Sequence, residues 1–293
     1  MGKDLAEQYP VARRTFEEAD EALGYPLSRL CIEGPEDQLR LTEITQPAIL
    51  TVSVAAWRVL KENGVLPAFV AGHSLGEYSA HVAAGTASFP DAVRTVRNRG
   101  KYMQEAVPVG VGAMAAILGM SPADVAEVCK KAAGGEVVSP ANLNSPEQTV
   151  IAGSAAAVKR AVETASQAGA KRAVILAVSA PFHCSMLMPA QQRLETDLRA
   201  AKFSALRFPV ITNVDAEAIT SGEEARESLI RQVTMPVRWL DSVREMIETG
   251  VNIFVEVGPG KVLTGLIKRI AETTNASSIG TPDDIARFKA AQG

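Results

Sequence analysis

The sequence FVAGHSLGEYSAHVAAG, residues 69–85, constrains the fold more strongly than any other part of the chain. It places Ser74 between Gly72 and Gly76, where an apolar run gives way to a helical pattern. A serine flanked in this way is typical of a tight turn that leads from a buried strand into a helix. The residues that follow are rich in Ala and Ser, which lets the helix pack close to a sheet. The stretch therefore predicts one strand–turn–helix unit of an α/β fold.

Ser74 itself has two interpretations. A strand-to-helix turn of the form G-x-S-x-G exposes the serine hydroxyl as a nucleophile, and the backbone N–H groups after it can stabilise an oxyanion. Alternatively, the turn is simply lined by glycines, and a small serine caps the helix. The apolar run before Ser74 and the helical pattern after it favour the nucleophile.

The outer parts of the chain alternate between helical patterns and short apolar runs. Helices are expected over residues 1–23, from Pro47 to Gly64, and from Pro90 to about Ala106. Buried strands are expected at VLPAFVAG, FPVITNV and NIFVEVG, with helices over EEARESLIRQV and WLDSVREMIETG. This alternation predicts a large α/β subdomain with a parallel sheet, made from residues 1–109 and 180–293.

The segment between these parts follows a different order. Its strands are predicted at GAMAAIL, EVVSPANLN, QTVIAG and KRAVILAV, and its helices at SPADVAEVCKKAAG and SAAAVKRAVETASQAGA. The order strand–helix–strand–strand–helix–strand is that of a ferredoxin-like unit. We therefore expect residues 110–179 to form a small inserted subdomain.

Composition narrows the function classes. The net charge of −3 gives no reason to expect nucleic-acid binding, and no apolar run approaches the length of a membrane span. The polar, acidic start does not resemble a signal peptide. Three scattered cysteines suit neither a disulfide framework nor a metal site, and no HExxH-type spacing occurs. We expect a cytoplasmic enzyme or binding protein without a metal.

A nucleophilic serine needs a base, and the chain has three histidines. His81 falls on the helix after the turn, where it is expected to pack or to face solvent. His73 adjoins Ser74, and side chains of neighbouring residues usually diverge. His183 follows an apolar run and lies beside Pro181, as expected for a base at the end of a strand. Elimination favours His183.

The third member of a triad would be an acid between the serine and the histidine in chain order. Five carboxylates are available there: Glu105, Asp124, Glu127, Glu136 and Glu147. Most of them fall in the predicted insert, and none has a recognisable signature. A serine–histidine dyad is the alternative.

Arg99 is the most informative charged residue. On the predicted helix, Ala92, Val96, Arg99 and Met103 are spaced four, three and four residues apart, so they share one face. An arginine within an apolar stripe is costly unless an anion meets it. It could reach solvent, pair with a structural glutamate, or hold a substrate carboxylate with its planar fork.

Several motifs together resemble the malonyl-CoA:acyl carrier protein transacylases, an acyltransferase family of fatty acid and polyketide synthesis. They are TQPAIL, AGHSLGEYSA, RGKYMQEAVPVGVGAMAAI, NLNSPEQTVIAG, APFH, RQVTMPVRW and VEVGPGKVLTGLIKR, and they extend over nearly the whole chain. The resemblance implies an α/β-hydrolase-like core with an inserted ferredoxin-like subdomain, in agreement with the order of elements.

The resemblance also implies roles for individual residues. Ser74 matches the nucleophile, His183 the general base and Arg99 the arginine that holds the malonyl carboxylate. The family has no acidic third member; its histidine is oriented by a main-chain carbonyl at the position of Gln232. The backbone N–H of Leu75 matches an oxyanion donor.

Three further positions match with less detail. Gln46 and Asn142 correspond to polar positions near the family's site. Phe182 precedes the histidine, as in family members that take malonyl, and it is expected to crowd the α-methyl group of methylmalonyl.

The implied reaction is a ping-pong transfer of malonyl from malonyl-CoA, through a malonyl-serine, to the phosphopantetheine thiol of acyl carrier protein, without a cofactor. Two other functions stay open: a serine hydrolase such as a thioesterase, and an inactive scaffold that binds the carrier. We expect a monomer. An acidic carrier would dock on local basic residues, with Lys171-Arg172 and Lys261, Lys268 and Arg269 as candidates.

The family pattern begins with a strand and a glutamine loop of the type FPGQGSQ, followed by Met-Gly. The present sequence opens at MGKDLAEQYP, which matches that internal Met-Gly. We therefore expect one strand and one oxyanion donor fewer, with an exposed sheet edge. This predicts low stability and activity for the 293-residue form, or a functional start upstream.

Overall fold

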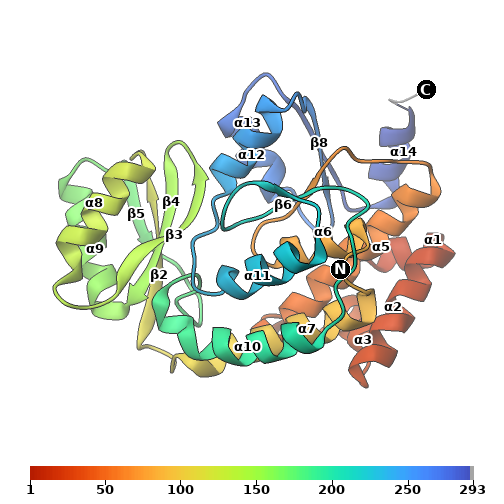
Figure 1. Cartoon of the computed structure of the whole chain (residues 1–293), viewed down its shortest axis with the longest axis horizontal. Helices are drawn as coiled ribbons and strands as arrows, with labels where there is room; N and C mark the ends of the chain where they lie inside the picture. Colours follow the sequence, from red (N-terminus) through yellow and green to blue (C-terminus); the bar gives the residue numbers. More distant parts are fainter. Residues whose placement is uncertain (291–293) are drawn as a thin grey trace.

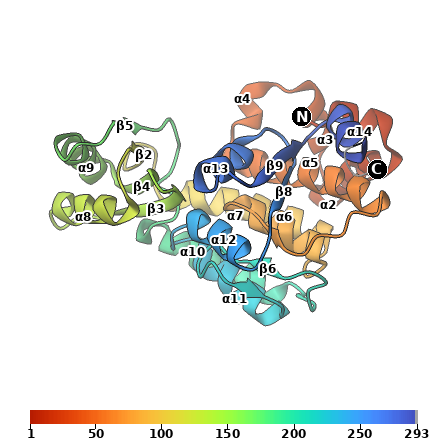
Figure 2. The ribbon, with the colours of Figure 1, turned by 90° about the horizontal axis from the view of Figure 1, so that it is seen from above.

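The computed structural model describes residues 1–290. Helices and short strands form a broad body, and a smaller unit of four strands and two helices lies at one end of it (Figure 1). Figure 2 shows the same unit beside the body from above. None of the described helices is long and apolar enough to cross a membrane.

The body contains two small sheets. In the first, β1 (Val70–Ala71) pairs in parallel with β6 (Val210–Ile211), which pairs antiparallel with β7 (Ala218–Ile219). In the second, β8 (Ile253–Val257) pairs in parallel with β9 (Asn275–Ile279). The expected parallel pairing is confirmed for β1 and β6, but the sequence analysis misses β7, which makes the first sheet mixed, and β9, the partner of β8. Among the described residues, β1 and β8 each pair on one side only.

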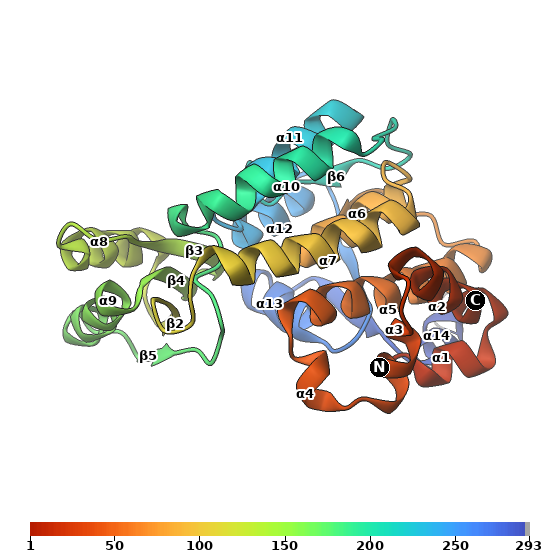
Figure 3. The ribbon, with the colours of Figure 1, turned by 90° about the horizontal axis from the view of Figure 1, so that it is seen from below.

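Long helices cover these sheets and build the main apolar core. Their bounds are α5 (Thr42–Glu62), α6 (Leu75–Ala84), α7 (Phe89–Ala106), α10 (Met188–Ala200), α11 (Gly222–Gln232), α12 (Trp239–Glu248) and α13 (Val262–Ile270). Seen from below, α7 runs between α10 and α5 (Figure 3). The core of buried Leu, Val and Ala side chains extends from α5 across α7 to α10. This packing fixes the position of α7 along its axis and its rotation about that axis. Arg99 lies on this helix.

Shorter elements complete the body. They are α1 (Lys3–Gln8), α2 (Pro10–Leu23), α3 (Leu27–Glu33), α4 (Glu36–Leu39), the 3₁₀ turn η1 (Ser185–Leu187) and α14 (Pro282–Ala290). The single helix expected over residues 1–23 is wrong in one respect, because it breaks at Tyr9, which is extended before Pro10. The helix expected to start at Pro47 begins at Thr42 and contains that proline in its first turns.

The smaller unit contains β2 (Gly112–Leu118), α8 (Pro122–Ala133), β3 (Val138–Ser145), β4 (Gln148–Ser154), α9 (Ala155–Gln167) and β5 (Arg172–Ile175). Its strands form one antiparallel sheet in the order β3-β4-β2-β5. Ser121 and Ser154 cap the two helices, as their positions before the helical patterns predict. A separate apolar cluster lies between the helices and the sheet.

Candidate active site

Ser74 occupies a sharp turn between β1 and α6. Its φ of 51° is positive, a conformation that is uncommon for a residue with a side chain. The turn needs glycine at position 72, because a Cβ there would lie 2.0 Å from the carbonyl carbon of Gly76. A Cβ at Gly76 would meet nothing within 4 Å. The first glycine of the motif is therefore a steric requirement of the turn, whereas the second is not.

The hydroxyl of Ser74 lies against the imidazole of His183, with Oγ 2.7 Å from Nε2. The other ring nitrogen, Nδ1, is 2.8 Å from the main-chain oxygen of Gln232. A carbonyl only accepts, so Nδ1 carries the proton and Nε2 of the neutral ring is left to accept from Ser74. This tautomer is the one that a general base requires.

No carboxylate contacts His183 in residues 1–290. The five acids considered as third members are engaged elsewhere: Glu105 with Arg193, Asp124 with Ser121, Glu127 with Lys130, Glu136 with Arg160 and Glu147 with Lys171. The main-chain oxygen of Gln232 orients the ring instead. The pair Ser74–His183 therefore has the geometry of a dyad.

Burial and charge both act on His183. Burial, and after it the nearby positive charge of Arg99, lower the pKa of His183 to about 3. The imidazole is consequently neutral at neutral pH and can take a proton. The same environment makes the imidazolium costly, so a proton taken from Ser74 is readily passed on.

Arg99 lies within the apolar face of α7, as its spacing predicts, and its residue is only 2% exposed. Its Nη2 donates to Ser74 Oγ at 3.0 Å and to the side-chain oxygen of Gln232 at 3.0 Å. Its Nη1 donates to Gln46 Oε1 at 2.8 Å. Within the described chain no carboxylate forms an ion pair with it, which leaves a buried guanidinium beside the serine able to meet an anion.

The remaining expected residues lie at different places. Gln46 contacts Arg99 directly, and Phe182 packs between the apolar clusters beside His183. Leu75 begins α6, and its N–H donates to no protein acceptor in residues 1–290. Asn142 is buried in β3, and its main chain bridges to Val237.

The other two histidines stay apart from the reaction geometry. His73 turns away from Ser74 and pairs through Nε2 with Asn144 Oδ1 at 2.8 Å. His81 is fully buried on α6 and packs edge-on against Phe203. Among the described residues, no group of three or more potential ligand side chains is arranged to hold a metal ion.

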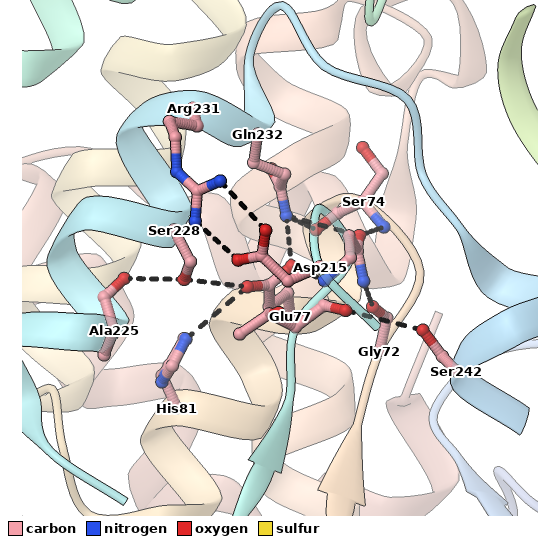
Figure 4. A network of polar contacts seen from close by, with 12 residues as sticks. Gly72, Ser74, Glu77, His81, Asp215, Ala225, Ser228, Arg231, Gln232 and Ser242 are labelled. Atoms are coloured by element: carbon pink, nitrogen blue, oxygen red, sulfur yellow. Dashed lines mark hydrogen bonds and ion pairs between the residues drawn. The ribbon is translucent and has the colours of Figure 1, made fainter. Parts of the chain in front are cut away.

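The structure adds polar residues that the sequence analysis missed (Figure 4). Asn213 is fully buried just after β6; its Oδ1 accepts from the Ser74 N–H at 2.7 Å, and its Nδ2 donates to Gly72 O at 2.7 Å. Glu77 accepts from the Asn213 N–H at 3.0 Å. The side-chain amide of Gln232 donates to Ser74 O at 3.0 Å. A polar residue at the second position after the apolar run FPVI is the one signal that could have indicated Asn213.

Comparison with known proteins gives a consistent result. The acyl transferase domain family matches residues 1–286. The malonyl CoA-acyl carrier protein transacylase of Escherichia coli K12 is 52% identical over 98% of this chain and 93% of its own length. A solved acyl carrier protein S-malonyltransferase from Vibrio cholerae has a TM-score of 0.97 at 49% identity, covering 98% of this chain and 94% of that one.

A third similar protein was solved as a complex described as "PlMCAT:AntF (holo): type II PKS acyl-carrier protein in complex with its malonyl-transacylase". Its TM-score is 0.95 at 48% identity, over 98% of this chain and 93% of that one. These matches extend over nearly the full length of the chain, which includes the contacting residues Ser74, His183 and Arg99. The chain belongs to the acyl transferase domain family.

Proposed function

We propose that this protein transfers the malonyl group from malonyl-CoA to the phosphopantetheine thiol of acyl carrier protein. The observation that carries the proposal is the hydroxyl of Ser74, which contacts a neutral base and a buried cation together: His183 Nε2 at 2.7 Å and Arg99 Nη2 at 3.0 Å. A base activates the nucleophile, and the cation suits an acyl group that ends in a carboxylate. The names of the similar proteins support the same reaction.

The first half-reaction forms a malonyl-serine. His183 Nε2 takes the hydroxyl proton as Ser74 Oγ attacks the thioester carbon of malonyl-CoA. The C–S bond then breaks, and the CoA sulfur leaves with the proton held by His183. The N–H of Leu75, which has no protein acceptor in the described chain, is available to the oxyanion. Arg99 holds the distal carboxylate by charge-assisted hydrogen bonds.

The second half-reaction reverses these steps on a different thiol. The carrier's phosphopantetheine thiol gives its proton to His183, and its sulfur attacks the serine ester. The C–Oγ bond breaks, and Ser74 recovers the proton. A thioester is already an activated acyl donor, so neither half-reaction requires a metal or a redox cofactor.

Mixing the protein with malonyl-CoA tests the proposal. We expect the intact mass to rise by one malonyl group, and the Ser74→Ala variant to show no increase. Removal of a general base costs about 10²–10⁴-fold in rate, so His183→Ala should form the ester at least that much more slowly. A full-rate His183→Ala variant would contradict the assignment. Release of free malonate without a carrier would favour a hydrolase instead.

We also propose a division of the chain into two subdomains. Residues 110–179 form a ferredoxin-like insert, supported by the strand order β3-β4-β2-β5 and by the separate apolar cluster between its helices and sheet. Residues 1–109 and 180–293 form an α/β-hydrolase-like catalytic subdomain, supported by the parallel pairing of β1 with β6 and by the turn at Ser74. In this arrangement the chain returns from the insert to the catalytic subdomain just before His183, which lies beside Ser74.

Phe182 is proposed to set the preference for malonyl over methylmalonyl. It lies next to His183 in the chain and, although only partly buried, packs against two neighbouring apolar clusters. A single methyl group discriminates by about 1–3 kcal/mol, so the preference is expected to be finite rather than absolute.

A further inference from the structure

Glu77 is a buried carboxylate behind the serine turn, and a charge buried there must be compensated by its neighbours. Figure 4 shows Glu77 among its polar contacts. It lies in the first turn of α6 and is fully buried. In the part of the chain that the structure describes, no lysine or arginine forms an ion pair with it. Arg231, on the neighbouring α11, is engaged by Asp215 at 2.9 Å. A buried carboxylate without a cation is costly, so its hydrogen-bond donors must compensate.

The donors to Glu77 come from two sides. Its Oε2 accepts from Gln232 Nε2 at 2.8 Å and from the Asn213 N–H at 3.0 Å. Its Oε1 accepts from Ser228 Oγ at 3.4 Å, and His81 Nε2 lies 3.8 Å from it. The shortest of these contacts, with Gln232, leads directly to the site.

Two acceptors, the carboxylate of Glu77 at 2.8 Å and the main-chain oxygen of Ser74 at 3.0 Å, determine which way the Gln232 amide faces. An ionised carboxylate only accepts hydrogen bonds, so Gln232 must present its NH₂ group to Glu77. Its oxygen then faces the opposite way, toward Arg99 Nη2 at 3.0 Å. The Gln232 amide thus lies between the negative charge of Glu77 and the positive charge of Arg99. Its dipole is oriented favourably toward both charges.

We propose that Glu77 is a positioning residue for recognition of the malonyl carboxylate, acting on Arg99 through the side-chain amide of Gln232. This inference rests on the proposed function, in which Arg99 holds that carboxylate. Without the charge of Glu77, the NH₂ group of Gln232 keeps only the neutral acceptors Ser74 O and Asn213 Oδ1. The amide is then held less firmly with its oxygen toward the guanidinium, which weakens the orientation of Arg99 toward Ser74. Acetyl has no carboxylate, so its transfer depends far less on this orientation.

A second route from Glu77 must be separated from the first. Through Asn213, Glu77 also supports the Ser74 N–H and hence the turn itself. Damage along that route slows every acyl group to the same degree. The ratio of malonyl to acetyl transfer therefore reports the route through Gln232 and Arg99, and an absolute rate does not.

The test compares the rate of Ser74 acylation by malonyl-CoA and by acetyl-CoA in single-turnover experiments followed by intact mass. We expect Glu77→Gln to lower the malonyl:acetyl rate ratio by about tenfold, as for weakening one hydrogen bond to a charged group. Ser228→Ala, the matched control, removes a donor to the other oxygen of Glu77 and should leave the ratio within about twofold, since the 3.4 Å contact is weak.

A double-mutant cycle with Gln232→Met identifies the route. Gln232→Met alone should also lower the ratio, and adding Glu77→Gln to it should produce no further fall. Equal losses for malonyl and acetyl in Glu77→Gln, or a full additional fall in the double variant, would overturn the inference. If Glu77→Gln fails to fold in a thermal melt, Gln232→Met decides, because an unchanged ratio there also overturns it. Absence of any malonyl-serine in the wild type would instead overturn the proposed function.

Discussion

At the scale of single residues, most of the contacts that matter for the reaction are made by one hydroxyl group. Ser74 Oγ meets the base His183 and the cation Arg99, while its N–H is held by Asn213. The base is neutral because burial and a positive neighbour both disfavour its charged form. This arrangement differs from a triad in the charged group near the imidazole. A triad has a carboxylate there, whereas this site has a guanidinium.

The lowered pKa of His183 predicts an unusual pH profile. With a pKa of about 3 in place of 6.5, the ring stays neutral as the pH falls, so the rate of Ser74 malonylation should stay level from pH 8 to about pH 5. Single-turnover rates by rapid quench measure this. A rate that halves near pH 6.5 would contradict it.

The lowered pKa of His183 also makes the stability of the folded protein depend on pH. The folded state binds fewer protons than the unfolded chain below pH 6.5, so the stability that neutral His183 contributes is present above pH 6.5 and is lost as the pH falls toward 3. Circular dichroism at each pH should therefore accompany the rates, to confirm that the protein is still folded where they are compared.

The role proposed for Arg99 predicts a change in selectivity. Arg99→Ala should slow malonyl loading by about 10²-fold, as for the loss of two hydrogen bonds to a charged group, and acetyl loading far less. Arg97→Ala is the control, because Arg97 lies on the same helix but is exposed and stacks over Tyr25. Acylation followed by intact mass gives both rates. Equal losses for the two acyl groups in Arg99→Ala would mean that Arg99 serves only the structure.

At the scale of elements, the crossing of α5 and α7 positions the arginine. Gly100, the residue after Arg99, lies against the start of α5, where a Cβ would be 2.5 Å from the carbonyl oxygen of Thr42. That neighbour is backbone and cannot move aside alone. The close approach of the two helices at this point therefore depends on glycine, although glycine is a poor helix former.

A pair of glycine substitutions tests the crossing. Gly100→Ala should destabilise the protein by about 1–3 kcal/mol, as overpacking does, and it should lower malonyl loading by displacing Arg99. Gly265→Ala in α13 is the matched control, because a Cβ there meets nothing within 4 Å. It should stabilise by up to about 1 kcal/mol through helix propensity. Urea denaturation measures both, and equal effects of the two substitutions would contradict the role of the crossing.

At the scale of the whole molecule, the two candidate basic segments meet at one hairpin. Lys171 pairs with Glu147 at 2.9 Å, and Arg269 on α13 donates to Gln148 Oε1 at 2.7 Å. Glu147, in the turn between β3 and β4, is adjacent to Gln148, the first residue of β4, so the segments from the two parts of the chain converge there. Arg172 and Lys268 next to them form no ion pair within residues 1–290, and their charges remain available to an acidic partner.

Carrier docking at this place should depend on those two charges and on salt. Reversing one of them, in Arg172→Glu or Lys268→Glu, should cost about 1 kcal/mol, or about a fivefold rise in the KM for the carrier at low salt. Lys3→Glu is the control, because Lys3 lies on α1, far from α13 and the small unit (Figure 1). The KM should also rise with salt in the wild type. A KM that does not respond to salt would indicate an apolar docking surface.

Much of the structure of this protein can be predicted from local sequence patterns. The turn at Ser74 follows from two glycines between a strand and a helix, and the buried position of Arg99 follows from helical spacing. All four strands and both helices of the small unit are predicted from their apolar runs and serine caps. These features are local because propensity, spacing and capping act within a few residues.

Other features depend on the fold alone. β1 and β6 are two residues long and therefore carry almost no periodic signal, while β7 and β9 escape prediction altogether. Asn213, Glu77 and the side chain of Gln232 are isolated polar residues, and Asn213 and Gln232 come from segments more than a hundred residues away from Ser74 along the chain. The group that orients His183 is a backbone oxygen, which every residue possesses. By itself, the sequence determined the nucleophile's turn, the buried arginine and the order of elements, because each is encoded within a few neighbouring residues. Only the tertiary structure decided which distant polar groups hold them in place, because hydrogen bonding across such separations depends on how the helices and strands pack.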